Sequence, residues 1–115
     1  MLIDFNKIEK TVLPAFKGGE GEYHARMFTD DNNKIMYGCL PAGSSIGMHT
    51  HTGNSEIIYI LSGNGKVMYD DTEEALSKGS CHYCPEGHTH SLINNSDSDL
   101  KFFAVVPEHS RCSRT

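Results

Sequence analysis

The sequence predicts a single all-β domain of the sandwich or barrel class. Its apolar and β-branched residues fall in many short segments, and turn residues separate these segments at close, regular intervals. No internal segment carries the longer periodicity of an amphipathic helix. With 115 residues, eleven of them glycine, the chain has room for one hydrophobic core. We therefore expect one domain spanning residues 1–115.

The strand pattern can be followed along the chain. A turn rich in Asp and Asn at residues 29–33 separates the first two predicted strands. Asn64-Gly65 predicts a tight hairpin between the strand that starts at Glu56 and the next one, and the acidic residues 70–74 are expected to form a solvated loop. The predicted strands are residues 23–28, 34–40, 49–51, 56–61, 66–69, 80–84, 90–93 and 100–106.

The two ends of the chain lie outside this pattern. Residues 1–16 mix helical and strand signals, and we expect them to form an N-terminal arm over the outside of the domain. Residues 110–115 are polar and are expected to form a frayed tail.

Charge and composition exclude several classes of function. The net charge is −5 and the ten basic residues are scattered, so the basic stripe of a nucleic-acid-binding protein is missing and binding to an anionic membrane is disfavoured. The longest apolar run, residues 57–61, is too short to span a membrane, and the N-terminus does not resemble a signal peptide. We expect a cytoplasmic protein. Its cysteines are then free thiols: Cys39, Cys81, Cys84 and Cys112.

Three polar side chains in the middle of the chain suggest a metal site. His49 and His51 lie two residues apart on a predicted strand and therefore point to the same face. Glu56 follows a Thr-Gly-Asn-Ser turn and can return a carboxylate to these imidazoles. Imidazole and carboxylate together suit a divalent transition metal. Because His-x-His pairs also occur as ordinary polar strand residues, the prediction needs a further ligand.

A second histidine-bearing block supplies that ligand. His90 follows the turn Pro85-x-Gly87 and can begin a new strand. The two blocks together resemble the two motifs of the cupin superfamily. The first block matches as Gly43, five residues, His49-x-His51, four residues, Glu56, six residues and Gly63; the second matches as Gly79, five residues, Pro85-x-Gly87, two residues, His90, three residues and Asn94.

The resemblance to cupins implies both a fold and a ligand set. The fold is a double-stranded β-helix, which is a jelly-roll barrel. The implied metal ligands are His49, His51, Glu56 and His90. Three nitrogens and one carboxylate leave one or two positions open on a five- or six-coordinate ion, as catalysis or ligand binding requires. The cofactor is expected to be one divalent transition metal per chain (Mn, Fe, Ni, Co, Zn or Cu); the alternative is a barrel in which these residues only form hydrogen bonds.

Other residue types that bind metals or anions are assigned different roles. Cys81 and Cys84 lie on opposite faces of a predicted strand, so we interpret them as buried thiols rather than a zinc or redox pair. His82 shares one face of this strand with Cys84, and Cys81 shares the other with Tyr83. Either face can be the interior one. His88 is expected at the rim of the barrel. Arg26 is the basic residue best placed to meet an anionic substrate inside the barrel, but we favour a surface salt bridge.

The sequence also suggests a function class and an assembly. The cupin resemblance favours a metal-dependent enzyme acting on a polar small molecule, such as an organic acid or sugar derivative, by oxygenase, isomerase or lyase chemistry. The alternative is a non-catalytic module that binds or senses a small ligand through its metal. Ile57, Tyr59 and Leu61 point away from the face that carries Glu56. Either the N-terminal arm or a second subunit can cover these three side chains, and we expect a homodimer.

Overall fold

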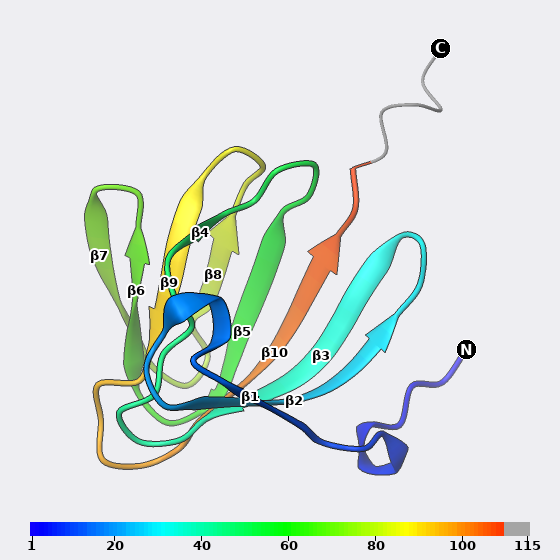
Figure 1. Ribbon diagram of the computed structural model, residues 1–115, viewed down its shortest axis with the longest axis horizontal. Helices are drawn as coiled ribbons and strands as arrows, with labels where there is room; N and C mark the ends of the chain where they lie inside the picture. The colour runs from blue at the N-terminus through cyan, green and yellow to red at the C-terminus, as the bar shows by residue number, and fades with distance from the viewer. Residues whose placement is uncertain (110–115) are drawn as a thin grey trace.

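Two antiparallel β-sheets face each other in this protein and form the predicted jelly-roll barrel (Figure 1). The computed structural model describes residues 1–109. Its only helical elements over that range are two single 3₁₀ turns, η1 (Phe5–Lys7) and η2 (Phe16–Gly18). The strands are β1 (Thr11–Pro14), β2 (Glu22–Thr29), β3 (Asn33–Leu40), β4 (His49–Thr50), β5 (Glu56–Ser62), β6 (Gly65–Tyr69), β7 (Thr72–Leu76), β8 (Cys81–Cys84), β9 (Thr89–Ile93) and β10 (Leu100–Pro107).

The order of the strands brings the two histidine-bearing blocks together. The larger sheet has the order β1-β2-β3-β10-β5-β8, and the smaller sheet has the order β4-β9-β6-β7. The first block contributes β4 to the smaller sheet and β5 to the larger one. The second block does the same with β9 and β8. Each block therefore places side chains on both walls of the barrel.

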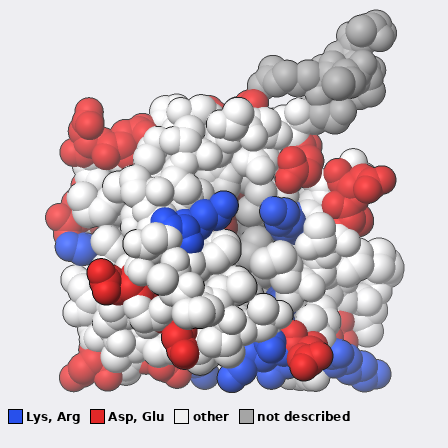
Figure 2. All heavy atoms as spheres, viewed as in Figure 1, with Lys and Arg blue, Asp and Glu red and all other residues white. Residues whose placement is uncertain are grey.

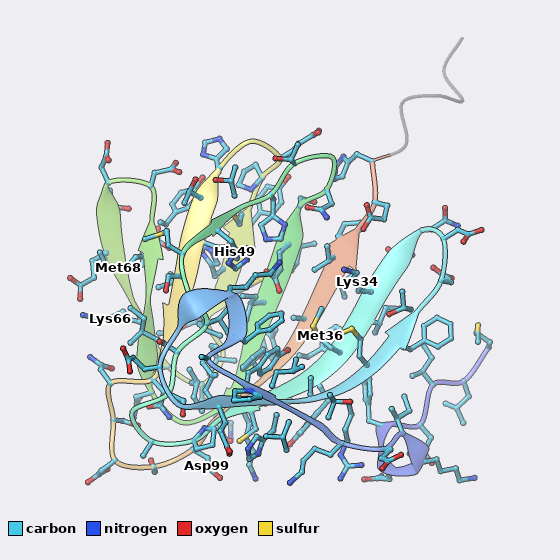
Figure 3. The ribbon with its side chains drawn as sticks, viewed as in Figure 1. Lys34, Met36, His49, Lys66, Met68 and Asp99 are labelled. Carbon is cyan, nitrogen blue, oxygen red and sulfur yellow. The ribbon has the colours of Figure 1, made fainter. Side chains whose placement is uncertain are left out.

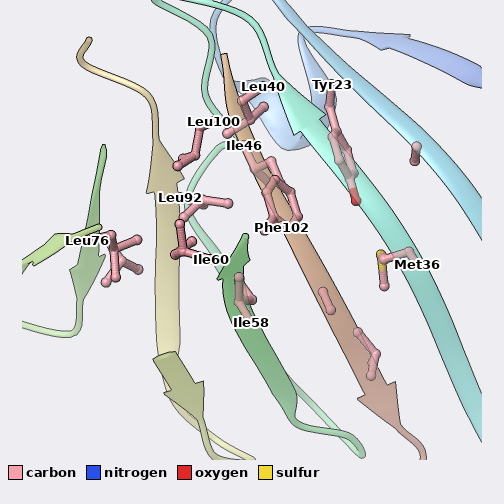
Figure 4. Close-up of a cluster of buried hydrophobic side chains, with 14 residues drawn as sticks. Tyr23, Met36, Leu40, Ile46, Ile58, Ile60, Leu76, Leu92, Leu100 and Phe102 are labelled. Atoms are coloured by element: carbon pink, nitrogen blue, oxygen red, sulfur yellow. The ribbon is translucent and has the colours of Figure 1, made fainter. Parts of the chain in front are cut away.

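The hydrophobic core lies between the sheets and follows from strand alternation. Every second residue of β10 is buried, with Phe102 at the centre of the strand. Ile58 and Ile60 follow the same rule on β5. Leu92 reaches the same cluster from β9 in the opposite sheet (Figure 4). This packing fills one end of the barrel with apolar side chains and leaves the other end for polar groups.

The predicted Asn64-Gly65 hairpin is wrong. Residues 62–65 carry the chain from β5 in the larger sheet to β6 in the smaller one, and these two strands do not pair. Gly63 has a φ of 90°, and a Cβ at this position would approach the carbonyl oxygen of Asp99 to 2.3 Å. Residues 62–65 therefore make a tight crossing between the sheets, in which a close backbone contact excludes a side chain at Gly63.

The interpretation of residues 70–74 as a loop is also wrong in part. A tight turn at Asp70, whose φ is 49°, joins β6 to β7, and these strands form the real hairpin. β7 lies at the edge of its sheet, and its first residues are exposed and include Glu73 and Glu74. Charged residues protect an edge strand from pairing with other chains. The same charges made this strand resemble a loop in the sequence.

The N-terminal residues are attached to the larger sheet. β1 pairs in antiparallel fashion with β2 at the edge of that sheet. The ring of Phe5 contacts the rings of Tyr37 and Phe103, with centroids 6.1 and 6.3 Å away. The predicted tail at residues 110–115 lies outside the described residues. No helix in residues 1–109 has the length and apolar character needed to cross a membrane.

Candidate metal centre

Four side chains that the sequence singled out meet inside the barrel: His49, His51, Glu56 and His90. One ligand atom from each of them lies within 4.8 Å of the others. His90 Nε2 is 3.1 Å from His49 Nε2 and 2.9 Å from His51 Nε2. Glu56 Oε1 is 3.0 Å from His90 Nε2 and 3.1 Å from His51 Nε2. Three nitrogens and one oxygen thus point towards a common centre.

Strand pairing explains this convergence. His49 on β4 and His90 on β9 are direct cross-strand neighbours in the smaller sheet. His51 follows β4 and is anchored to the turn after β8, since its amide donates to the carbonyl of His88 and its carbonyl accepts from the amide of Gly87. Glu56 is the first residue of β5 and points inward from the larger sheet. The site therefore bridges the two sheets.

The second nitrogen of each imidazole is held by a partner of its own. His49 Nδ1 is 2.8 Å from the carbonyl oxygen of Gly47, which can only accept a hydrogen bond. His51 Nδ1 is 2.7 Å from Asn54 Oδ1, which also accepts. In the neutral imidazoles these bonds place the proton on Nδ1 and leave Nε2 with a lone pair. The lone pairs therefore face the Glu56 carboxylate, and this donor set fits a divalent transition metal.

The electrostatics of the cluster keep its acid ionised. Burial alone would raise the pKa of Glu56, but hydrogen bonds with His51 and His90 outweigh burial and lower this pKa from 4.5 to about 2. The hydrogen bond to Glu56 raises the pKa of His51, whereas burial lowers the pKa of His49. A proton on His51 Nε2 is thus stabilised by Glu56. A metal ion competes with that proton for the same nitrogen.

Comparison with known proteins identifies the family. The sequence matches the family described as "Cupin domain" over residues 36–106, which is more than half of the chain. The chain belongs to the cupin family. The match covers both histidine-bearing blocks and the strands between them.

Individual relatives agree with this assignment. A protein named oxalate-binding protein, from Thermotoga maritima, is 33% identical over 113 residues, which cover 92% of this chain and 93% of the relative. A solved structure from Thermotoga maritima, described as a predicted oxalate decarboxylase, superposes with a TM-score of 0.88 at 28% identity over 94% of this chain and 99% of the other. KdgF from Halomonas sp. shares the fold, with a TM-score of 0.79 at 12% identity over 100% of both chains.

This cupin also contains a histidine, His82, that contacts the cluster through the ring nitrogen of His90 that faces away from it. His82 on β8 is buried, so the face it shares with Cys84 is interior, while Cys81 and Tyr83 are exposed. The interpretation of Cys81 as a buried thiol is therefore wrong, because strand alternation turns it away from the core. His82 Nε2 lies 3.0 Å from His90 Nδ1, and His82 Nδ1 lies 3.3 Å from Glu74 Oε1. The sequence placed His82 and Cys84 on one face but gave no sign of Glu74, because the strand that carries Glu74 resembled a loop.

His82, Cys84 and His90 form a second possible ligand group. Burial, followed by the charge of Glu56, raises the pKa of the Cys84 thiol to about 11. Because the thiolate is the form of cysteine that binds metals, this environment opposes a metal at Cys84. The group also shares His90 with the first cluster. We therefore assign His82 to the support of His90.

His88 lies apart from the cluster. Its Nδ1 is 2.6 Å from Asp70 Oδ2 and 3.3 Å from the Tyr69 hydroxyl oxygen, and both His88 and Asp70 are well exposed. Its carbonyl still holds the amide of His51. The His88 ring is thus a surface group of this cupin, within the second motif but outside the candidate site.

A pocket of about 230 Å³ opens beside the cluster. His49, His51 and Glu56 form one part of its lining. Apolar side chains form most of the rest, and two lysines, Lys17 and Lys34, also contribute. Arg26 does not line this pocket; it donates to the carbonyl oxygen of Ile8 instead. The basic residues at the pocket are therefore different from the one that the sequence suggested.

Proposed function

We propose that this cupin binds one divalent transition metal through His49, His51, Glu56 and His90, and that the metal anchors a small organic acid in the adjacent pocket. The observation that carries the proposal is the set of three Nε2 atoms and one carboxylate directed at a single point beside the pocket. When bound, such an ion supplies a Lewis-acid centre to which carboxylate oxygens bind.

The charges around the pocket support an acidic ligand. Glu56 is the only acidic residue in the described lining, and it faces the imidazoles. Lys17 and Lys34 add positive charge to a protein whose net charge is −5. The relative named oxalate-binding protein supports the same class of ligand. An organic acid fits these observations better than a neutral sugar does.

Ligand binding is the function that the pocket favours. Apart from the proposed metal ligands, its described lining has no histidine or carboxylate able to act as a general acid or base. Tyr23 is present, but burial and the Glu56 charge raise the pKa of its hydroxyl, which therefore stays protonated. These side chains orient and enclose a ligand rather than transfer protons.

A metal-dependent enzyme acting on an organic acid is the second candidate. The likeness to the structure described as a predicted oxalate decarboxylase, at 28% identity, favours it. In that case the chain's own residues would hold the acid against the ion. Cleavage of the carbon–carbon bond would release carbon dioxide, and a proton from solvent would replace it on the remaining carbon, which for oxalate gives formate. Product analysis separates the candidates, because a binding module returns its ligand unchanged.

The test of metal binding begins with elemental analysis of natively purified protein and of protein reconstituted with Mn, Fe, Ni, Co, Zn or Cu. Wild-type protein should bind about one ion per chain. His51→Ala should lose most of this metal while its circular dichroism stays that of a β protein. His88→Ala, whose ring lies outside the cluster, is the matched control and should retain the metal. Full occupancy in the His51 variant would refute the ligand set.

The test of ligand binding uses the same preparations. Calorimetric titration with oxalate and other small acids should show binding to metal-loaded protein and at least tenfold weaker binding after chelation. Equal affinity with and without metal would contradict the anchoring role. Incubation of each acid with metal-loaded protein, with and without dioxygen, then reports any product.

We further propose the cytoplasm as the site of action and a homodimer as the assembly. Cys39, Cys81 and Cys84 are all free thiols, as expected in a reducing compartment. The case for the homodimer rests on the outer face of the larger sheet, where Ile57, Tyr59 and Tyr83 are exposed.

A further inference from the structure

We propose that Lys17 and Lys34 form a second anion-binding point in the pocket that the metal ligands also line, so that the pocket takes a short aliphatic dicarboxylate. This inference rests on the proposed function for one end of the ligand, which binds at the metal centre. The lysines concern the other end. Figure 2 shows basic side chains on both sides of a hollow in this face of the molecule.

Lys34 occupies an inward-facing position at the open end of the barrel. On β3 the side chains of Lys34, Met36 and Leu40 lie on one face, and Met36 and Leu40 are buried in the core. Lys34 pairs across the strands with Val106, which also lines the pocket. Figure 3 shows Lys34 above Met36 on the larger sheet and His49 on the other sheet, and all three residues line the pocket. Lys34 is therefore the one cation in a row of inward-facing β3 side chains that also contains the apolar Met36 and Leu40.

Lys17 reaches the same pocket from η2, which is fixed in place. The amide of Gly47 donates to the carbonyl of Phe16 at 3.0 Å. A Cβ at Gly47 would lie 2.0 Å from the carbonyl oxygen of Lys17, so glycine permits this close contact between η2 and the segment before β4. Lys17 itself has a φ of 55°, which non-glycine residues rarely adopt. The turn is thus held in an uncommon conformation directly over the pocket.

Neither lysine forms an ion pair with an acidic residue in the part of the chain that the structure describes. Within residues 1–109 the ion pair formed by a lysine is that of Lys66 with Glu73. The Lys17 ammonium lies 5.6 Å from the centroid of the Phe16 ring, which is a contact that leaves its charge available. The described lining thus contains two cations that have no carboxylate partner within residues 1–109, together with a single acidic residue, Glu56.

The walls between the two charged ends determine the class of ligand. Met36, Ile46 and Val106 give the pocket an apolar wall, which would contact methylene groups. A bare oxalate has no such groups to bury. The volume of about 230 Å³ lies below the roughly 300–1,000 Å³ of pockets for drug-sized ligands. The fitting class is therefore a dicarboxylate with a few methylene groups between its acids.

The experiment compares glutarate with pentanoate, which has the same chain length but one carboxylate. Calorimetric titrations are made with metal-loaded and with metal-free protein. Metal-loaded wild-type protein should bind glutarate about tenfold or more tightly than pentanoate, because a second carboxylate gains charge-assisted hydrogen bonds to lysine. Lys17→Met and Lys34→Met should each reduce this preference by about two- to fivefold, because an exposed ion pair contributes little binding free energy. The double variant should abolish it.

Control variants separate the effect of the two lysine charges from effects on folding and on metal binding. Lys66→Met removes an equally long cation outside the pocket and should leave the preference unchanged. Lys17→Gly removes the charge while suiting the backbone at φ = 55°, so it guards against a misfolded turn. Metal affinity should stay the same in all lysine variants.

The outcomes separate this inference from the proposed function. Metal binding without a lysine-dependent preference for glutarate overturns the inference and leaves the metal centre standing. A lysine-dependent preference in protein that binds no metal supports the inference and overturns the metal centre. Retention of the full preference in the double variant, or no glutarate binding in either form, rejects the second anion-binding point.

Discussion

At the scale of single residues, the orientation of His90 depends on a chain of hydrogen-bonding groups. Glu74 on the exposed edge strand contacts buried His82, and His82 contacts His90 Nδ1. With His82 Nδ1 directed at the Glu74 carboxylate, His82 Nε2 accepts from His90. This arrangement leaves His90 Nε2 as a ligand in the cluster. A surface carboxylate thereby sets the tautomer of a buried imidazole.

We expect changes in this chain to weaken metal binding. His82→Phe and Glu74→Gln should raise the metal dissociation constant by about 10- to 100-fold, the range measured for residues that orient metal ligands. His82→Gln, which still offers an acceptor to His90 Nδ1, should recover much of the affinity. Competition titration with a metal indicator measures these constants.

The matched control is Glu73→Gln, since Glu73 lies next to Glu74 on β7 but forms its ion pair with Lys66 on β6. It should leave metal affinity unchanged. If His82→Phe binds metal as tightly as the wild type, the positioning role is wrong.

The same residues predict the pH dependence of metal occupancy. Metal binding requires the neutral form of His51, and the hydrogen bond to Glu56 raises the His51 pKa above its ordinary 6.5. Protons therefore compete already above that value, and occupancy should fall as the pH drops through it. Glu56 stays ionised over this range, because its pKa is lowered to about 2. Elemental analysis after dialysis at a series of pH values measures the curve, and constant occupancy down to pH 5 would contradict it.

At the scale of strands, Gly38 shows how closely β3 packs on the core. A Cβ at Gly38 would lie 2.5 Å from ring atoms of Phe102 and 2.9 Å from the Tyr23 ring. These two rings stack on each other, with centroids 5.8 Å apart. The strand therefore uses glycine so that both rings can lie flat against its backbone.

We expect Gly38→Ala to destabilise the protein by about 1–3 kcal/mol, the usual cost of overpacking a core. Chemical denaturation of metal-free protein measures this loss. Phe102→Leu removes the ring that clashes, so the double variant should lose less than the sum of the two single variants. Additive losses would show that the clash is relieved elsewhere.

The sequence predicted the structure well where a local pattern of residues has a single structural role. Alternation located most strands, and the fixed spacing of His49, His51, Glu56 and His90 located side chains that meet in the structure. Other features depended on contacts between distant segments. Charges on β7 concealed an edge strand and with it Glu74.

The pocket lysines were missed for a related reason. Lys17 lies in a turn next to a flexible-looking glycine stretch, and only its docking on Gly47 brings it to the pocket. Lys34 follows an Asx-rich turn and resembled an ordinary surface residue. No local pattern records that β3 and the turn at η2 border the same hollow.

At the scale of the whole molecule, the outer face of the larger sheet is apolar around β5 and β8. Tyr83 on β8 pairs with Ile57 on β5, and Ile57 pairs in turn with Val105 on β10. Phe5 from the N-terminal segment covers Phe103 at the β10 side of this face. The β5–β8 side stays exposed, with 41% of Ile57 and 54% of Tyr83 accessible. Large adjoining apolar residues of this kind mark an interaction surface.

We expect two copies of the chain to associate through this β5–β8 surface. Sedimentation velocity should give a dimer mass for the wild type at micromolar concentration. Tyr59→Glu places a charge at the centre of the surface, next to Ile57, and should yield a monomer because burying an unpaired carboxylate is costly. Val12→Glu, at an exposed apolar position on β1 away from this surface, should remain dimeric. A wild-type monomer mass at every concentration would contradict the homodimer, whereas dissociation of the Val12 variant would move the interface to the β1 edge.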